Sequence, residues 1–199
     1  MPAETGGLAH RWPLDDLPDL RDELLAAYDA EGRSYHDIRH LTEVLDRLEE
    51  LGCDDVVVRL AAWFHDAVYD AAAGDEERSA VWAERALPPE LAGEVARLVR
   101  VTAAHDPAAD DLAGQQLCDA DLAILAARPG RYEEYARDVR REYAAVPDDD
   151  FARGRGAILT GLLMRPRLFH SERARALWEQ PARANVAAEL DRLRTEELL

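Results

Sequence analysis

Two ionisable side chains, His65 and Asp66, stand side by side in the otherwise apolar stretch AAWFHDAVYD, residues 61–70. The surrounding Ala, Trp, Phe and Val residues predict that this stretch is buried in the fold. Burying a carboxylate is costly unless it is paired, hydrogen-bonded or bound to a metal. We therefore expect a compensating group beside His65 and Asp66, and a bound metal ion is one such group.

Other histidines and aspartates occupy positions from which they could share this metal. His36 and His40 are four residues apart, so they lie on one side of a predicted helix, with His40 at the border of its apolar face. His40, His65, Asp66 and one aspartate of the later stretch LCDADLAIL would provide nitrogen and oxygen donors together. Such a mixed donor set suits Mn, Fe, Co, Ni or Zn. The sequence thus predicts a divalent transition-metal cofactor.

The two aspartates of LCDADLAIL, Asp119 and Asp121, lie about 200° apart around a helix and cannot both face one metal. The residues three and four positions from Asp121 are Leu, Ile or Cys, whereas those around Asp119 include two glutamines. Periodicity therefore favours Asp121 as the ligand and predicts that Asp119 lies on the more polar side. Asp119, like His36, is expected beside the ligands or as an alternative to one of them.

Amphipathic helices are expected to position these residues. Apolar residues recur at intervals of three and four in nearly every segment, and no alternating strand pattern is present. Ser34 is the expected N-cap of the helix that carries His40, and Gly52 is expected to end that helix. The predicted helices span residues 17–31, 35–51, 55–70, 75–87, 89–105, 114–127, 130–145, 149–164 and 171–197. We expect an all-α single domain over residues 1–199, in which the helices of 130–197 pack on a metal-site core of about 35–127.

Composition excludes several classes of function. The net charge of −17 opposes binding to a nucleic-acid polymer or an anionic membrane surface. All 24 basic residues are arginine, so there is no lysine for a Schiff base or a phosphate-binding loop. The arginines of GRGAILTGLLMRPR are expected to form a solvated or ion-pairing face, and phosphate binding by Arg153 or Arg155 is the alternative. The two cysteines lack metal-site spacing, and no targeting segment or 18-residue apolar run is present. We expect a soluble cytoplasmic protein, and a homo-oligomer is compatible with the sequence.

The order His40, His65-Asp66 and Asp121 resembles the H…HD…D signature of the HD-domain superfamily of metal-dependent phosphohydrolases. A little-characterised branch of predicted hydrolases within it is similar to the stretches YHDIRHLTEVL, FHDAVYD, DEERSA, VTAAH, CDADLAIL and GRGAILTGLLMRPRLFHSERARALWEQPARANVAAEL. The resemblance extends over most of residues 35–190. It implies a helical bundle of the HD-domain type in which His40, His65, Asp66 and Asp121 bind the metal.

A metal in this position suits phosphoester hydrolysis, because it would activate a water molecule and offset charge on the phosphoryl group. The resemblance implies that Asp66 would both bind the metal and hold the water, while His105 or Glu77 could act as a proton donor or contact the substrate. The expected substrate is a small phosphorylated metabolite or nucleotide.

Two departures from the family pattern leave the water-orienting residue open. Many HD nucleotidases carry a glutamate shortly after the dyad, whereas this chain has Val68, Tyr69 and Asp70 there. Asp75 stands where the branch usually has an asparagine before the Glu of DEERSA. Glu77 is a candidate for the water-orienting role.

Several alternatives compete with this interpretation. The stretch HDIRH resembles the HExxH motif of zinc peptidases, but Asp37 replaces the glutamate that would act as the base. A di-iron oxygenase of the HD type would need a second set of ligands, for which His36 and His105 are available. A non-catalytic HD module would use the metal for structure and bind a nucleotide or a partner. Without a metal, the dyad would need an ion pair with Arg39 or Arg59.

Overall fold

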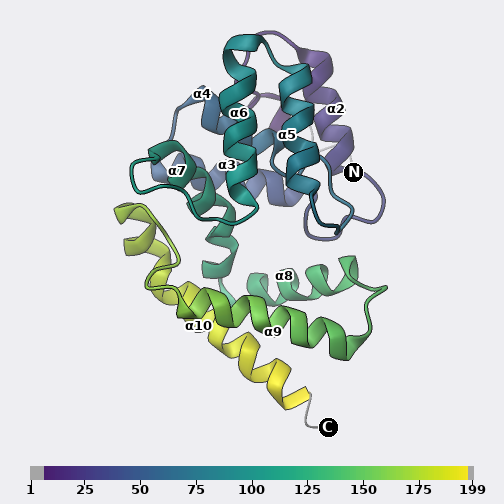
Figure 1. Ribbon diagram of the computed structural model, residues 1–199, viewed down its shortest axis with the longest axis vertical. Helices are drawn as coiled ribbons and strands as arrows, with labels where there is room; N and C mark the ends of the chain where they lie inside the picture. Colours follow the sequence, from purple (N-terminus) through teal and green to yellow (C-terminus); the bar gives the residue numbers. More distant parts are fainter. Residues whose placement is uncertain (1–6, 197–199) are drawn as a thin grey trace. The chain divides into compact units, whose positions relative to one another are not determined.

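In the computed structural model, which describes residues 7–196, the chain is helical and contains no strand within that range (Figure 1). Each helix predicted from the periodicity has a counterpart, although the segment 114–127 is divided between an α-helix and a 3₁₀ helix. The all-α class is therefore confirmed. The helices are α2 (Pro18–Tyr28), α3 (Ile38–Leu51), α4 (Val56–Phe64), α5 (Asp75–Ala86), α6 (Pro89–Thr102), α7 (Leu112–Asp121), η1 (Leu122–Ala126), α8 (Pro129–Glu142), α9 (Asp148–Met164) and α10 (Glu172–Glu196).

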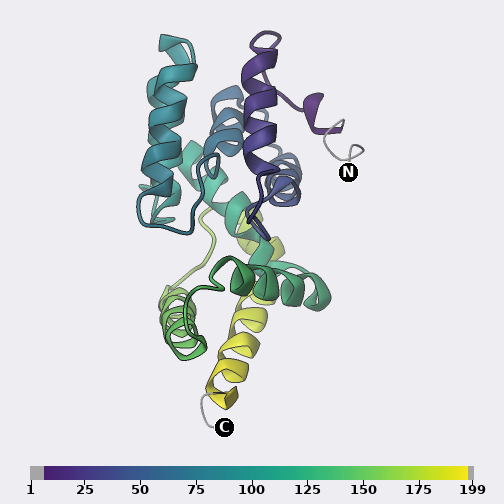
Figure 2. The ribbon, with the colours of Figure 1, turned by 90° about the vertical axis from the view of Figure 1, so that its right-hand side faces the viewer.

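Packing divides the chain after Asp121 into two compact units. The first unit contains α2 to α7, and its helices α5 and α6 lie side by side as an antiparallel pair in Figure 1. In the view of Figure 2, turned by 90°, these two helices overlap. The second unit contains η1 and α8 to α10, and α10 contacts both η1 and α9. A single domain over residues 1–199, with the C-terminal helices packed on the metal-site core, stays a prediction.

Helix α4 forms the centre of the first unit. It contacts α3, α5, α6 and α7, and six of its nine residues are buried, including Trp63 and Phe64. The side chain of Asp55 caps its first turn by accepting a hydrogen bond from the Val57 N–H at 2.8 Å. The helix ends at Phe64 rather than continuing over residues 55–70 as predicted. The His-Asp dyad therefore lies in the turn that follows α4.

Helix α3 presents a single apolar face to the core, as its periodicity predicted. Gly52 ends the helix with a φ of 75°, a left-handed conformation that glycine adopts without steric cost. The prediction that Ser34 is the N-cap is wrong, because the N-cap is Asp37. Its side chain accepts hydrogen bonds from the backbone N–H groups of Arg39 at 2.9 Å and His40 at 3.1 Å. Asp37 thus has a structural role at the start of α3, and His40 lies in the first turn.

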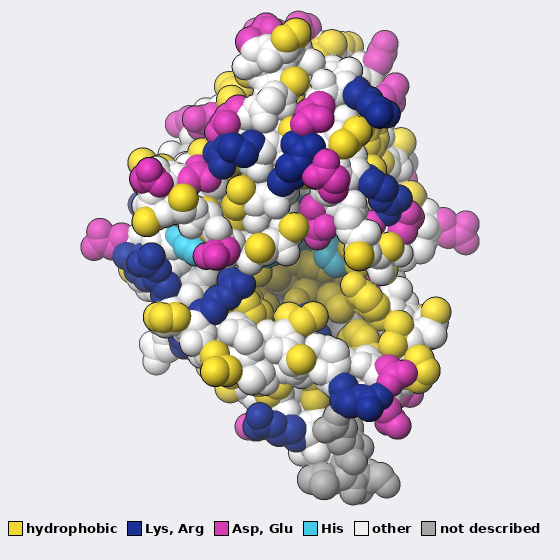
Figure 3. All heavy atoms as spheres, in the orientation of Figure 1, with side chains coloured by type: hydrophobic (Ala, Val, Ile, Leu, Met, Phe, Trp, Pro, Cys, Tyr) yellow, Lys and Arg dark blue, Asp and Glu magenta, His cyan; other side chains and the backbone are white. Residues whose placement is uncertain are grey.

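Charged side chains of both signs are intermixed on the face of the molecule drawn in Figure 3. Arg155 forms an ion pair with the buried Glu189 at 2.8 Å, and Arg153 forms an ion pair with Asp150. Between residues 7 and 196, the helices are all too short or too polar to cross a lipid bilayer.

Candidate metal site

Three separate segments of the first unit bring potential metal ligands together. His40 lies in the first turn of α3, His65 follows the last residue of α4, and Asp121 is the last residue of α7. One donor atom from each of these residues lies within 4.8 Å of the other two. Both histidines are only 1% exposed. This group could hold a metal ion.

The spacing of the donor atoms fits a shared ion. The Nε2 atoms of His40 and His65 are 3.0 Å apart, and Asp121 Oδ1 lies 3.3 Å from the first and 3.6 Å from the second. Asp66 Oδ2 lies 3.2 Å from His40 Nε2 and 3.1 Å from His65 Nε2. Ligands that share one metal with bonds of about 2.1 Å stand about 3.0–3.4 Å apart. Asp66 thus lies close to both histidines, but the group of three mutually close donors does not include it.

The ring of His65 is held in the orientation that metal binding requires. Its Nδ1 atom lies 2.8 Å from the carbonyl oxygen of Ala62, which can only accept a hydrogen bond, so Nδ1 carries a proton. In the neutral ring, Nε2 is then unprotonated and faces Nε2 of His40. Two unprotonated nitrogens repel each other at 3.0 Å, so the site requires a cation or a proton between them.

The carboxylates strongly favour positive charge on the two histidines. Burial alone lowers the pKa of His40, but hydrogen bonds to Asp121 and Asp66 outweigh this effect and raise the pKa to about 9. Burial also lowers the pKa of His65, whereas the charges of Asp66 and Asp121 raise it well above its usual value. Without a metal, protons occupy the place of the cation, and metal binding must displace them.

The two aspartates are correspondingly held in the charged form. Burial raises the pKa of Asp66, but the positive charges of His65 and His36 lower it well below its usual value. Burial likewise raises the pKa of Asp121, and the charge of His65 together with a hydrogen bond from His105 lowers it well below its usual value. Ionised carboxylates are available as ligands across the neutral pH range.

His105, predicted as a proton donor or substrate contact, lies at the edge of this cluster. Its Nε2 is 2.7 Å from Asp121 Oδ2, while the other oxygen of Asp121 faces His40 and His65. The His105 side chain is 24% exposed, so it connects the cluster with solvent. Its φ of 47° is a left-handed conformation that costs about 1–3 kcal/mol in a residue other than glycine. The fold holds His105 in this position despite that cost.

His36 lies next to the cluster but outside the group of three donors. Its ring stacks on Tyr69, with the ring centroids 4.0 Å apart and the planes inclined by 25°. The centroid of the His40 ring is 5.6 Å away. Tyr69 thus packs against a histidine that neighbours the donor group.

Glu77, the candidate for orienting water, lies on the surface instead. Its side chain is 58% exposed, and its two carboxylate oxygens accept hydrogen bonds from Arg100 at 2.6 and 2.7 Å. These bonds lower the pKa of Glu77. The nearby Asp75 is buried, and its carboxylate accepts hydrogen bonds from the backbone N–H groups of Asp70 at 2.9 Å and Ala72 at 3.2 Å. These bonds hold the loop before α5 in place. Neither carboxylate belongs to the donor group.

Asp119 is fully buried, which contradicts the expectation that it lies on the more polar side of its helix. Helix α7 contacts α3, α4 and α6, so more than one of its sides faces the core. A single apolar face was therefore the wrong description of α7. Asp121, not Asp119, is the residue of this pair that joins the group of His40 and His65.

Arg33 is the main site residue that the sequence analysis missed. Its guanidinium donates hydrogen bonds to the carbonyl oxygens of His36 at 2.8 Å, Asp66 at 2.7 Å and Ala67 at 2.9 Å. It also lies over the rings of Tyr28 and Tyr69, 5.2 and 5.7 Å from their centroids. Arg33 thus ties the segment before α3 to the turn that carries the dyad.

The arginines considered as partners of the dyad pair with other residues. Arg39 pairs with Glu43 at 3.3 Å, and Arg59 lies 3.8 Å from Glu49. The side chain of Asp66 interacts with the buried histidines.

Comparisons of the chain with protein-family models, curated proteins and solved structures gave no match.

Proposed function

We propose that this protein is a metal-dependent phosphohydrolase of the HD-domain type that acts on a small phosphorylated metabolite or nucleotide. The observation that carries the proposal is the buried group of His40, His65 and Asp121. Asp66 would be a further ligand, since its Oδ2 atom lies 3.1–3.2 Å from Nε2 of both histidines. The order of these residues along the chain supports it, because it resembles the H…HD…D signature.

The proposed reaction assigns separate tasks to the residues around the site. A divalent ion held there would lower the pKa of a water molecule and offset negative charge on a phosphoryl oxygen. Asp66, which is 16% exposed, would accept a hydrogen bond from the attacking water and so orient it. His105 would hold Asp121 through Nε2 and, when protonated, supply a proton to the leaving alkoxide.

The exposure of the cluster supports a substrate that approaches from one side. His40 and His65 are buried, whereas the side chains of Asp66, Asp121 and His105 are 16%, 14% and 24% exposed. The net charge of −17 opposes a polyanion, so a small phosphate ester is the substrate class that we favour.

The test is to purify the protein, determine its metal content and assay a broad panel of phosphomonoesters and nucleotides. Each assay would contain Mn, Co, Ni or Zn, with a chelator as the blank. We expect hydrolysis of at least one phosphoester in the presence of metal and no turnover after chelation. The Asp121→Asn variant should lose both metal and turnover.

The matched control for that variant is Asp119→Asn, which makes the same change in the same helix outside the donor group. Stoichiometric metal without turnover on any substrate would contradict the proposal and favour a non-catalytic module that binds a nucleotide or a partner. Two iron ions per chain with oxygen-dependent chemistry would favour a di-iron oxygenase.

A further inference from the structure

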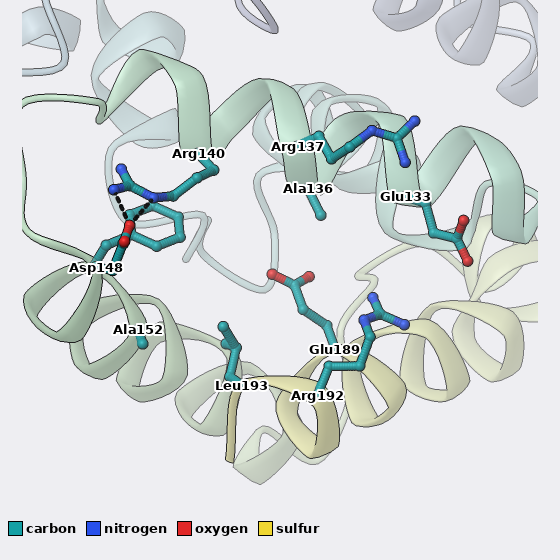
Figure 4. Close-up of a pocket in the computed structure, with 10 residues that line it drawn as sticks. Glu133, Ala136, Arg137, Arg140, Asp148, Ala152, Glu189, Arg192 and Leu193 are labelled. Carbon is teal, nitrogen blue, oxygen red and sulfur yellow. Dashed lines mark hydrogen bonds and ion pairs between the residues drawn. The ribbon is translucent and has the colours of Figure 1, made fainter. Parts of the chain in front are cut away.

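Helices α8, α9 and α10 of the second unit line a pocket of about 730 Å³ (Figure 4). Pockets that bind small molecules generally have volumes of about 300–1,000 Å³. No residue of the candidate metal site lines this pocket, so the proposed phosphohydrolase activity does not explain it. Ala136, Phe151, Ala152 and Leu193 contribute apolar surface to its walls.

A buried ionic network forms part of the pocket. Glu189 is 5% exposed, and its carboxylate accepts hydrogen bonds from Arg155 Nε at 2.8 Å, Arg155 Nη2 at 3.2 Å and the Tyr132 hydroxyl at 2.5 Å. These bonds use both carboxylate oxygens and balance the charge of Glu189. Because buried, fully bonded side chains hold one position, this part of the pocket is preformed.

The remaining charged groups divide the pocket into two ends. At one end, Arg140 pairs with Asp148 and lies over the ring of Phe151, 4.8 Å from its centroid. At the other end, Arg137 extends from α8 and Arg192 from α10, close to Glu133 (Figure 4). The first end is therefore neutralised internally, whereas the second carries two arginines.

The two arginines at the second end are available to a ligand. Within residues 7–196, the exposed side chains of Arg137, Arg192 and Glu133 make no ion pair and no hydrogen bond. This end therefore has a local charge of +1 in a chain whose net charge is −17. Arginine binds carboxylates well because its planar guanidinium can donate two parallel hydrogen bonds.

We propose that this pocket binds a small organic monoanion with an apolar body, such as an aromatic carboxylate. The anionic group would lie between Arg137 and Arg192, and the apolar body would extend along Ala136 and Leu193 toward Phe151. The proposal stands on the pocket, its preformed network and the two arginines, and it is independent of the phosphohydrolase activity.

The test uses the full chain and benzoate as the probe, with benzyl alcohol as its uncharged counterpart. Binding is measured by calorimetry and by amide chemical-shift changes in residues 129–193. We expect benzoate to bind and benzyl alcohol to bind at least about tenfold more weakly. The double variant Arg137→Gln/Arg192→Gln should weaken benzoate binding by at least about tenfold.

Two further variants separate charge from shape. Arg153→Gln removes an arginine of the same unit that does not line the pocket, and it should change the affinity by less than about twofold. Ala152→Leu adds bulk to the wall without changing charge and should also weaken benzoate binding. The proposal is overturned if benzoate does not bind, if benzyl alcohol binds equally well, or if the double variant keeps the original affinity.

Discussion

Replacement of Arg33 by alanine is expected to destabilise the protein and to weaken metal binding at the same time. The guanidinium makes three hydrogen bonds to backbone carbonyls, those of His36, Asp66 and Ala67, at 2.7–2.9 Å. These bonds hold the dyad turn against the segment before α3. Alanine would leave the three carbonyls without this donor and the dyad turn without this constraint.

The size of the effect follows from these contacts. A hydrogen bond from a charged donor contributes about 1.5–3 kcal/mol, but Arg33 is only partly buried and water can replace some of its bonds. We therefore take about 1 kcal/mol for each carbonyl bond and about 0.5 kcal/mol for each of its two contacts with Tyr28 and Tyr69. The total is about 4 kcal/mol, which is a large share of the usual 5–15 kcal/mol of a native protein.

Two measurements test this prediction. Urea unfolding of the chelated protein gives the loss of stability in Arg33→Ala relative to the original chain. Calorimetric titration with Mn or Zn gives the loss of metal affinity, which we expect to be about 10–100-fold because the ligand-bearing turn is no longer held in place. Arg33→Lys should retain part of both properties, since an ammonium group can reach some of the carbonyls but cannot bind all three in one plane.

The control is Arg39→Ala, which removes an arginine that is 51% exposed and paired with Glu43. This substitution should change stability by less than about 1 kcal/mol. A similarly small effect of Arg33→Ala, together with unchanged metal affinity, would refute the reasoning.

The remaining predictions concern the donor group. His65→Ala or Asp66→Ala should abolish metal binding and lower stability, because each leaves buried partners without a counter-charge; metal analysis and urea unfolding measure both, and full occupancy in either variant would contradict the assignment. Asp121→Asn should lose the metal and Asp119→Asn should keep it, as metal analysis can show, whereas the reverse pattern would transfer the ligand role to Asp119. The chelated protein should lose stability as pH rises from about 6.5 to about 9. Folding raises the pKa of His40 to about 9, so protonated His40 stabilises the folded state fully below the pKa of about 6.5 that it has in the unfolded chain, and this stabilisation is lost as the pH rises through about 9. The metal-loaded protein should gain stability over the same interval, because ligation needs neutral imidazoles; unfolding curves that run parallel with and without chelator would argue against a metal bound by these histidines.

Local sequence patterns predicted the helices well because each pattern depends on residues within one or two turns. The apolar face of α3 and the glycine that ends it are examples. The end of α4 is a counterexample, since the apolar pattern continues past Phe64 while the helix does not. Arg33 binds the carbonyls of Asp66 and Ala67 from more than thirty residues away, and no local pattern reveals such a contact.

The candidate site could be predicted only where burial and residue type agreed. His40, His65 and Asp121 combine metal-binding side chains with apolar neighbours, and the structure places them together. Asp119 was placed on the more polar side of its helix because of its glutamine neighbours, but it is buried because α7 contacts several helices. Glu77 lies on the surface beside Arg100, a residue of another helix that no local pattern connects with it.

The position of Asp121 has a consequence for the order of events during protein synthesis. His40, His65 and Asp121 are separated along the chain, and Asp121 is the C-terminal residue of its unit. A ribosome that adds about 5–20 residues per second completes the two histidine-bearing segments seconds before it adds Asp121. The three-residue group thus exists only after the whole first unit has been made. An ion bound by all three residues therefore binds only after the chain of the first unit is complete, whereas an earlier ion would find two of the three ligands.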